Sequence, residues 1–201
     1  MATIPEAMAI GWGHVRAGEW PQAQAVYRQV VAADPFVAQA WYLLGAASQA
    51  RGDLDEAVAS YRQALRLVPD FAEVCNNLAL ILQQQGRHAE ALAMLRRALQ
   101  IKPDYADASS NLGNALQDQG ELDEAIACYL RAIHHQPDFA DAHHNLGQAL
   151  RARGQFAEAV ACYNSALRLR PDHALVHLSR ALAWLQMGDF ARGWPEHEWR
   201  L

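Results

Sequence analysis

The sequence predicts an all-α protein built as an array of one repeated helical hairpin. Glycines recur every 34 residues, as from Gly18 to Gly52, prolines keep the same period, and apolar residues follow helical spacing between them. The glycines are Gly18, Gly52, Gly86, Gly120, Gly154 and Gly188, and the prolines are Pro35, Pro69, Pro103, Pro137 and Pro171. A fixed period of this length indicates repeats that bury a continuous core only by stacking on their neighbours.

The composition is that of a folded protein and narrows the classes of partner. Of the 201 residues 52% are hydrophobic and 19% are charged, which excludes a disordered chain. The 17 basic residues are outnumbered by 22 acidic ones and form no basic run, so we expect no nucleic-acid partner. No apolar stretch has the roughly 18 residues of a membrane helix, and the first residues lack a signal-peptide pattern. Three cysteines without metal-ligand spacing suit a reducing compartment, so we predict a cytoplasmic protein without membrane contact.

The period divides the chain into six units. They start at Ile4, Ala38, Ala72, Ala106, Ala140 and Ala174. We expect residues 1–201 to form a single repeat domain, in which residues 174–201 are an incomplete, degenerate terminal or junctional unit. Positions that lie a whole number of periods apart share a register, so equivalent residues of different units can be compared.

Each unit is predicted to hold two amphipathic helices, as residues 38–71 illustrate. Their apolar positions are Trp41 and Leu44 in the first helix and Val58, Tyr61 and Leu65 in the second. Gly52 follows the first helix, where a left-handed C-terminal cap favours glycine. Pro69 ends the second helix because it lacks an N–H donor and clashes with the preceding turn.

Acidic residues predict where helices start. Asp70 follows the helix-ending proline and precedes Glu73 by three positions, a pattern typical of an N-cap with a capping box. The pattern recurs at Asp104 and Asp138, and Asp53 is expected to cap the second helix of its unit in the same way.

Small residues recur inside the helices at two registers. They are Gly45, Ala79, Gly113, Gly147 and Ala181 in the first helices, and Ala23, Ala57, Ala91, Ala125 and Ala159 in the second. A glycine inside a helix costs about 1 kcal/mol relative to alanine. Its recurrence therefore needs a cause, and we expect a close approach of the partner helix.

This pattern resembles the tetratricopeptide repeat, whose signature joins a Trp, a Leu-Gly pair, an Ala, an aromatic residue, a second Ala and a Pro. The matching residues of the second unit are Trp41, Leu44, Gly45, Ala57, Tyr61, Ala64 and Pro69. Equivalents in the other units extend the resemblance over essentially the whole chain. The resemblance implies a right-handed superhelical solenoid of six repeats, whose concave groove is lined by the first helix of each pair.

Polar amides dominate the first-helix positions that the resemblance implies to face this groove. The residues that we predict to bind a peptide are Asn76, Asn77, Gln83, Asn111, Asn114, Gln117, Asn145, Gln148 and Arg151. Asn77, Asn111 and Asn145 share a register. Asparagine is a poor helix former, so helix stability does not explain this row. A side-chain amide can pair with both polar groups of a peptide bond in any sequence, so we expect an extended peptide or protein segment as the ligand. The alternative is that the amides only solvate the groove.

Two further resemblances bear on the partner. The asparagine row is similar to that in the repeat arrays of O-linked N-acetylglucosamine transferases, which implies a hold on the backbone of protein substrates. The family's carboxylate clamp of Lys and Arg is not matched, since its registers hold Tyr42, Leu43, Asn76, Ser110 and His144, and a chaperone co-factor is not expected. The segment Gly188–Arg200 resembles the junction where bacterial arrays lead into a glycosyltransferase-like domain, so one alternative function is the substrate-recruiting arm of a larger enzyme.

The last unit suggests another alternative, a structural array that self-assembles into a homo-oligomer. Terminal repeats usually present a polar outer face, whereas this unit is apolar. The residues predicted to self-associate are Leu178, Leu182, Leu185, Trp194, Trp199 and Leu201. The segment that follows Gly188 is expected to replace the usual second helix, because Pro195 interrupts it.

No constellation of residues indicates catalysis or metal binding. The nine histidines include the doublets His134-His135 and His143-His144, but adjacent residues on a helix point in different directions, so each doublet supplies one ligand at best. We predict no catalytic residue, no metal site and no cofactor, and therefore a protein that is not an enzyme.

Overall fold

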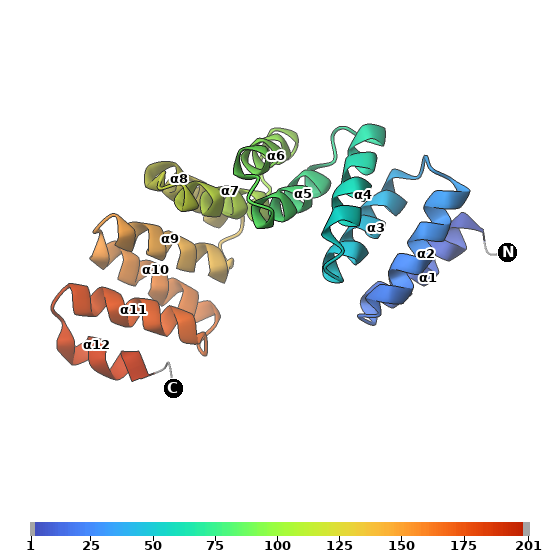
Figure 1. The fold of residues 1–201 in the computed structure, drawn as a ribbon. Helices are drawn as coiled ribbons and strands as arrows, with labels where there is room; N and C mark the ends of the chain where they lie inside the picture. The colour runs from blue at the N-terminus through green and yellow to red at the C-terminus, as the bar shows by residue number, and fades with distance from the viewer. Residues whose placement is uncertain (1–2, 199–201) are drawn as a thin grey trace. The chain divides into compact units, whose positions relative to one another are not determined.

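The computed structural model describes residues 3–198, and within this range it contains twelve α-helices and no strand (Figure 1). The helices are α1 (Ile4–Arg16), α2 (Trp20–Ala33), α3 (Ala38–Ala50), α4 (Leu54–Leu67), α5 (Ala72–Gln84), α6 (His88–Ile101), α7 (Ala106–Asp118), α8 (Leu122–His135), α9 (Ala140–Ala152), α10 (Phe156–Leu169), α11 (Ala174–Gln186) and α12 (Phe190–His197). Consecutive helices form six helix-turn-helix repeats. The predicted all-α class is therefore confirmed.

The recurrent glycines close the hairpins. All six have a positive φ, between 73° and 84°, as a left-handed C-terminal cap requires. After α3, the N–H of Gly52 donates to the carbonyl of Gln49, and the N–H of Asp53 donates to that of Ser48. These two bonds are the Schellman pattern, which satisfies carbonyls at the end of a helix, and they confirm the predicted role of the glycines.

The predicted aspartate N-caps are wrong for Asp70, Asp104 and Asp138, each of which lies one residue before the N-cap of its helix. Asp70 lies in the turn before α5, whose N-cap is Phe71, and no side-chain cap bond is made there. Asp53 does occupy the N-cap position of α4, but its carboxylate accepts from Gln24 of another hairpin instead of capping its own helix. In the first hairpin, the carboxylate of Asp34 accepts from the backbone N–H of Phe36 and stabilises the turn between repeats.

Helical glycines allow the two helices of a hairpin to approach each other closely, as predicted. A Cβ added to Gly45 would lie 2.6 Å from the ring of Tyr61, and one added to Gly113 would lie 2.6 Å from the ring of Tyr129. Both tyrosine rings are fully buried. The third hairpin instead has Ala79 at the register of the glycines and a buried Leu95 at the register of the tyrosines. The extra methyl group of the alanine is thus matched by a smaller side chain on the second helix.

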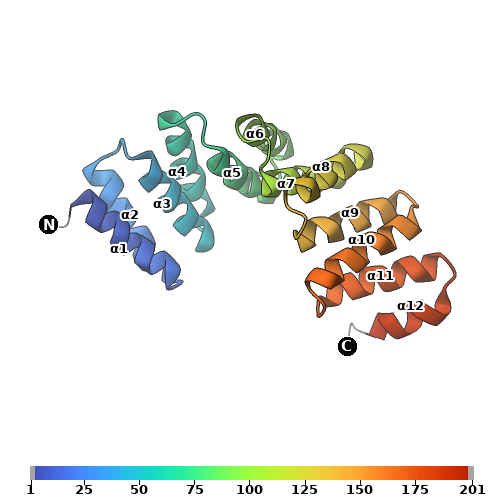
Figure 2. The ribbon, with the colours of Figure 1, turned by 180° about the vertical axis from the view of Figure 1, so that it is seen from behind.

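The six hairpins fall into two compact units, residues 1–102 and residues 103–201, each with three hairpins. Within each unit the second helix of one hairpin packs on the first helix of the next, as α2 on α3 and α10 on α11 (Figures 1 and 2). First helices of neighbouring hairpins also touch, α3 with α5 in one unit and α7 with α9 and α9 with α11 in the other. Over residues 3–198, second helices within a unit make no comparable contact, so the first helices lie on the inner side of each stack. That residues 1–201 form one domain stays a prediction.

The last hairpin differs from its prediction. Residues 190–197 do form a second helix, α12, although Pro195 lies inside it. Gly193 is buried on this helix, and a Cβ added to it would lie 2.6 Å from Leu185 of α11, so the short helix still packs closely. None of the helices along residues 3–198 has the length and hydrophobicity to cross a membrane.

Candidate peptide-binding surface

The predicted peptide-binding residues lie on α5, α7 and α9, the first helices of three successive hairpins. We call the side of each unit formed by its first helices the first-helix surface (α1, α3 and α5; α7, α9 and α11). Eight of the nine predicted residues are partly exposed there. The exception is Asn76, which is 4% exposed and therefore belongs to the interior.

In the second unit, two predicted asparagines meet directly. Nδ2 of Asn145 on α9 donates to Oδ1 of Asn114 on α7 over 3.0 Å. The same oxygen accepts from the hydroxyl of Tyr129 over 2.8 Å, and this hydroxyl also lies 3.1 Å from Oε1 of Gln117. Because the Tyr129 ring is buried against Gly113, its hydroxyl is fixed and in turn fixes the two amides of α7.

These bonds leave two groups of the pair uncommitted. Within the described residues, Nδ2 of Asn114 and Oδ1 of Asn145 form no hydrogen bond. One is a donor and the other an acceptor, and the hydrogen bond between the two side chains holds them close together. Asn111 lies one turn before Asn114 on α7 and is also partly exposed.

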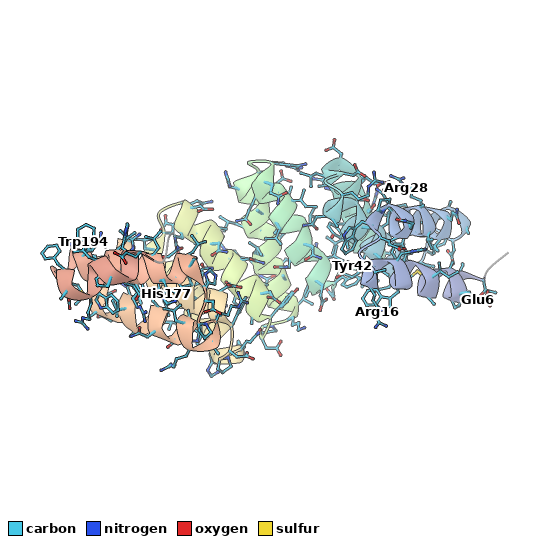
Figure 3. The ribbon with its side chains drawn as sticks, turned by 90° about the horizontal axis from the view of Figure 1, so that it is seen from below. Glu6, Arg16, Arg28, Tyr42, His177 and Trp194 are labelled. Carbon is cyan, nitrogen blue, oxygen red and sulfur yellow. The ribbon has the colours of Figure 1, made fainter. Side chains whose placement is uncertain are left out.

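In the first unit, aromatic residues surround the amides. Nδ2 of Asn76 donates to Oδ1 of Asn77 over 3.2 Å. The ring centroid of Tyr42 on α3 (labelled in Figure 3) lies 6.2 Å from that of Tyr61 and 5.1 Å from that of Phe71. Burial raises the pKa of both tyrosines, while a hydrogen bond from Asn77 to each acts against this rise. Both hydroxyls therefore stay protonated and help to orient Asn77.

Gln83 is less constrained than its equivalents. In its register, Gln49 accepts from the Tyr61 hydroxyl over 2.9 Å, and Gln117 faces that of Tyr129. In the hairpin of Gln83 the tyrosine is replaced by Leu95, and the Gln83 amide forms no bond in the described part of the chain.

At α9 the predicted residues bond to the last hairpin and to a buried histidine. Nη1 of Arg151 donates to Oε1 of Gln186 over 3.3 Å. Nε2 of Gln148 lies 3.2 Å from Nε2 of His144, which lies 3.0 Å from the Ser179 hydroxyl. Burial, helped by the nearby charge of a second histidine, lowers the pKa of His144 to about 4. The imidazole is therefore neutral at pH 7 and able to accept a hydrogen bond from the side-chain amide of Gln148.

The residues predicted to self-associate do not form one patch. Leu178, Leu182 and Leu185 on α11 are partly buried. Leu182 and Leu185 share registers with Asn114 and Gln83 and extend the first-helix surface as an apolar end, whereas Leu178 shares the register of the buried Asn76. Trp194 is 58% exposed and projects from α12 (Figure 3). Trp199 and Leu201 lie outside the described residues. The exposed apolar residues that the sequence analysis missed in this hairpin are Leu175, Met187 and Phe190.

The sequence analysis also missed the tyrosine hydroxyls as part of the site. It treated Tyr61 only as an apolar position of its helix, whereas Tyr61 and Tyr129 also bond amides of their own hairpins. The available signal was that the units with Tyr61 and Tyr129 in their second helices also have a glutamine as the second-to-last residue of their first helices.

Sequence comparison decides the family. The tetratricopeptide repeat family matches residues 8–70, and a second description of the same repeat matches residues 79–120, 113–150 and 147–188. The chain belongs to the tetratricopeptide repeat family. A search of curated protein sequences gave no match.

Solved structures of similar fold include those of PilW, MamA and YrrB. PilW, a type IV pilus biogenesis factor, is 25% identical, with a TM-score of 0.86 over 96% of this chain and 90% of its own. MamA is 28% identical, with a TM-score of 0.72 over 83% of this chain and 97% of its own. YrrB, described as a TPR protein with an unusual peptide-binding site, is 24% identical, with a TM-score of 0.69 over 87% of this chain and 90% of its own. The likeness to YrrB concerns the fold alone.

Proposed function

We propose that this tetratricopeptide repeat protein is a non-catalytic scaffold that binds an extended polypeptide on its first-helix surface, mainly through the ligand's backbone. The observation that carries the proposal is the asparagine pair, in which Nδ2 of Asn114 and Oδ1 of Asn145 are uncommitted and close together. A residue in an extended chain presents one N–H and one C=O, and this pair offers the complementary acceptor and donor.

Fixed amides favour such binding. The Tyr129 hydroxyl and the contact between the two asparagines hold Asn114 in one orientation before a ligand arrives, which lowers the entropy lost on binding. Because the backbone is common to all sequences, binding is expected to be tolerant of ligand sequence and weak for each contact. Asn111 would add a further contact along an extended ligand of the second unit, and such a ligand advances about 3.3 Å per residue. Asn77 and Gln83 would offer amide contacts of the same kind on the first unit.

The test uses fluorescein-labelled peptides of about twelve residues with unrelated, uncharged sequences, each made in a normal form and in a form with several N-methylated peptide bonds. We expect the normal forms to bind and the N-methylated forms to lose affinity, because N-methylation removes the backbone N–H that would donate a hydrogen bond to Oδ1 of Asn145. The double variant Asn114→Ala, Asn145→Ala should weaken binding about tenfold, since two hydrogen bonds contribute about 1–3 kcal/mol together.

The matched control is Gln100→Ala, which removes an exposed amide from the second helix α6. It should bind the peptides as the wild type does. Equal affinity of the N-methylated and normal peptides, or an unchanged affinity of the asparagine double variant with intact helical circular dichroism, would contradict the proposal.

A second candidate function is self-assembly, favoured by the exposure of Phe190 (59%) and Trp194 (58%) in the last hairpin. Exposed aromatic side chains next to each other on a short helix are typical of an interaction surface. Light scattering over a concentration series should then show an oligomer that Trp194→Glu disrupts. A strict monomer at all concentrations would exclude this candidate.

The substrate-recruiting arm of a glycosyltransferase stays a prediction from the segment Gly188–Arg200, and the matches described above give it no support. Its test is whether the reading frame continues past Leu201 into an α/β domain.

A further inference from the structure

A pocket of about 750 Å³ lies in the first unit, on the opposite side from the first-helix surface. Leu78 and Leu82 of α5 form its floor and are almost fully buried. Its walls are the second helices α4 and α6, with the small residues Ala59 and Ala93 facing the opening.

At the preceding interface, between the first and second hairpins, polar side chains close this position. There the buried Gln24 of α2 donates to Ser48 and Asp53, and it also bonds Glu56 of α4. Arg28 of α2 reaches the same Glu56 with two hydrogen bonds of 2.7 and 2.9 Å. Polar bonds therefore join α2 and α4 directly.

At the pocket the same registers hold residues that do not make these bonds. Val58 replaces the glutamine and Leu82 replaces the serine, so the buried part of the polar network is lost. Arg62 and Glu90, the equivalents of the arginine and the glutamate, are 3.7 Å apart. Glu90 instead accepts two bonds of 2.7 Å from Arg87 of its own hairpin. The contact between α4 and α5 is accordingly less extensive than that between α2 and α3.

The rim of the pocket is positively charged, although the chain as a whole carries a net charge of −5. Arg62, Arg66 and Arg97 line it, with Glu90 as the single acidic residue. Arg66 forms no ion pair or hydrogen bond within the described residues, and Arg97 donates only to the neutral carbonyl of Pro69 over 2.7 Å. Two guanidinium groups beside an apolar floor thus lack an acidic partner in the part of the chain that the structure describes.

We infer that this pocket is a docking site for an acidic amphipathic helix of a partner protein. The apolar floor takes the apolar stripe of the helix, and Arg66 and Arg97 pair with carboxylates beside that stripe. A drug-sized ligand is usually buried over about 70–90% of its surface. The exposed rim of Ala59, Arg62 and Ala93 covers only one side of an occupant, which suits a helix that keeps its other face in water.

The spacing of the lining residues sets the size of the occupant. From Ala59 to Arg66 the wall spans seven residues, or roughly 10 Å along α4, and from Glu90 to Arg97 it spans the same length along α6. Two turns of a helix have this length. Apolar residues at positions i, i+4 and i+7 would meet the floor, and acidic residues on the flank would lie near the arginines.

The test uses a synthetic, fluorescein-labelled helical peptide of about 16 residues with Leu at i, i+4 and i+7 and Glu on the flanking positions. Its control peptide has each Glu replaced by Lys. We expect the acidic peptide to bind the full chain at least tenfold more tightly, and raising the NaCl concentration from 50 to 500 mM to weaken this binding, since the paired charges lie at an exposed rim.

Two variants at exposed positions test the site without disturbing the core. Ala93→Phe should fill the pocket and Arg66→Glu should reverse its charge, and each should lower the affinity for the acidic peptide at least tenfold. The matched control is Ala127→Phe, which makes the same change at the same register on α8. This control, like the double variant Asn114→Ala, Asn145→Ala, should leave the affinity unchanged.

Several results would overturn the inference. They are failure of the acidic peptide to bind at millimolar concentration, equal affinity for the two peptides, and full binding by Ala93→Phe. A concentration-dependent dimer of the wild type that Ala93→Phe abolishes would assign the pocket to a second copy of this chain instead of a partner. None of these results bears on the peptide test of the first-helix surface, because its variants lie on α7 and α9, whereas the pocket is lined by residues of α4, α5 and α6.

Discussion

Gly113→Ala should destabilise the second unit, although alanine is the better helix former. The added Cβ would lie 2.6 Å from Cε1 of Tyr129 and 2.9 Å from both Cδ1 and Cζ of the same ring. Non-bonded carbon atoms normally stay about 3.5–4.0 Å apart. The ring or the helix must therefore move to accept the new methyl group.

The size of the effect follows from two opposing terms. The Tyr129 ring is fully buried and its hydroxyl is bonded to Asn114 and Gln117, so it has little freedom to shift. Overpacking of this kind costs about 1–3 kcal/mol, and we place Gly113→Ala near the upper end because three ring atoms are too close. Removing a glycine from a helix returns about 1 kcal/mol. The net loss is then about 1–2 kcal/mol.

The measurement is urea unfolding followed by circular dichroism at 222 nm, with two comparison variants. Gly13→Ala on α1 has no atom within 4 Å of the new Cβ and an ordinary helical φ, so it should stabilise the protein by up to about 1 kcal/mol. The double variant Gly113→Ala, Tyr129→Leu recreates the Ala79–Leu95 pair of the third hairpin. It should be more stable than the sum of the two single changes predicts.

The outcome that refutes this reasoning is a Gly113→Ala protein as stable as the wild type, or a double variant whose two effects simply add. Either result would mean that the helix contact adjusts without cost. The recurrence of glycine at this register would then need a cause other than close packing.

Three further outcomes follow from buried polar groups. Glu196→Ala should destabilise the last hairpin by about 3 kcal/mol in urea unfolding, because the loss of this carboxylate leaves the half-buried guanidinium of Arg180 without its acidic partner. The carboxylate also lies 2.6 Å from the ring of His177. A change in the free energy of unfolding below about 0.5 kcal/mol would contradict this prediction. Burial lowers the pKa of His144 to about 4, so the unfolded chain takes up the proton at a higher pH than the folded protein, and stability should fall as the pH drops from about 6.5 to 4. His144→Asn should flatten this pH dependence, and an equal slope in the wild type and the variant would refute it. Burial raises the pKa of the Cys162 thiol to about 11, so a disulfide reagent at pH 8 should modify it at least tenfold more slowly in native protein than in guanidinium chloride.

Periodicity alone was enough to predict the hairpins. Each recurrent glycine and proline acts through its own backbone, on φ or on a missing donor, so its effect can be deduced from one position. The aspartates did not follow this rule, because a carboxylate chooses among several donors. Asp53 has the N-cap position but bonds Gln24, a residue 29 positions earlier that only the folded stack brings near.

The candidate surface could be predicted only in part for the same reason. Register placed Asn114 and Asn145 on neighbouring first helices, and the structure adds that they bond each other. Sequence could not predict that Tyr129 fixes the pair, since this depends on which way a buried hydroxyl points. The burial of Asn76 beside a partly exposed Asn77 was missed although helix geometry favours it, because adjacent helical positions differ by about 100°.

The third hairpin differs from the second at two registers, where leucines replace a tyrosine and a serine. Leu95 in place of a tyrosine removes the need for a glycine at position 79, and it also removes the hydroxyl that binds the amide of the equivalent glutamines, which leaves Gln83 uncommitted. On the other side, Leu82 stands where the second hairpin has Ser48, so the polar closure seen at the first interface is absent and Leu82, with Leu78, forms the floor of the pocket. Each change replaces an internal hydrogen bond by an apolar contact, so the hairpin keeps its packing but has polar groups and apolar surface to spare. Polar groups and apolar surface that do not bond or pack within the stack are available to a ligand. For this reason α5–α6 is the hairpin of the first unit where we expect binding on both sides.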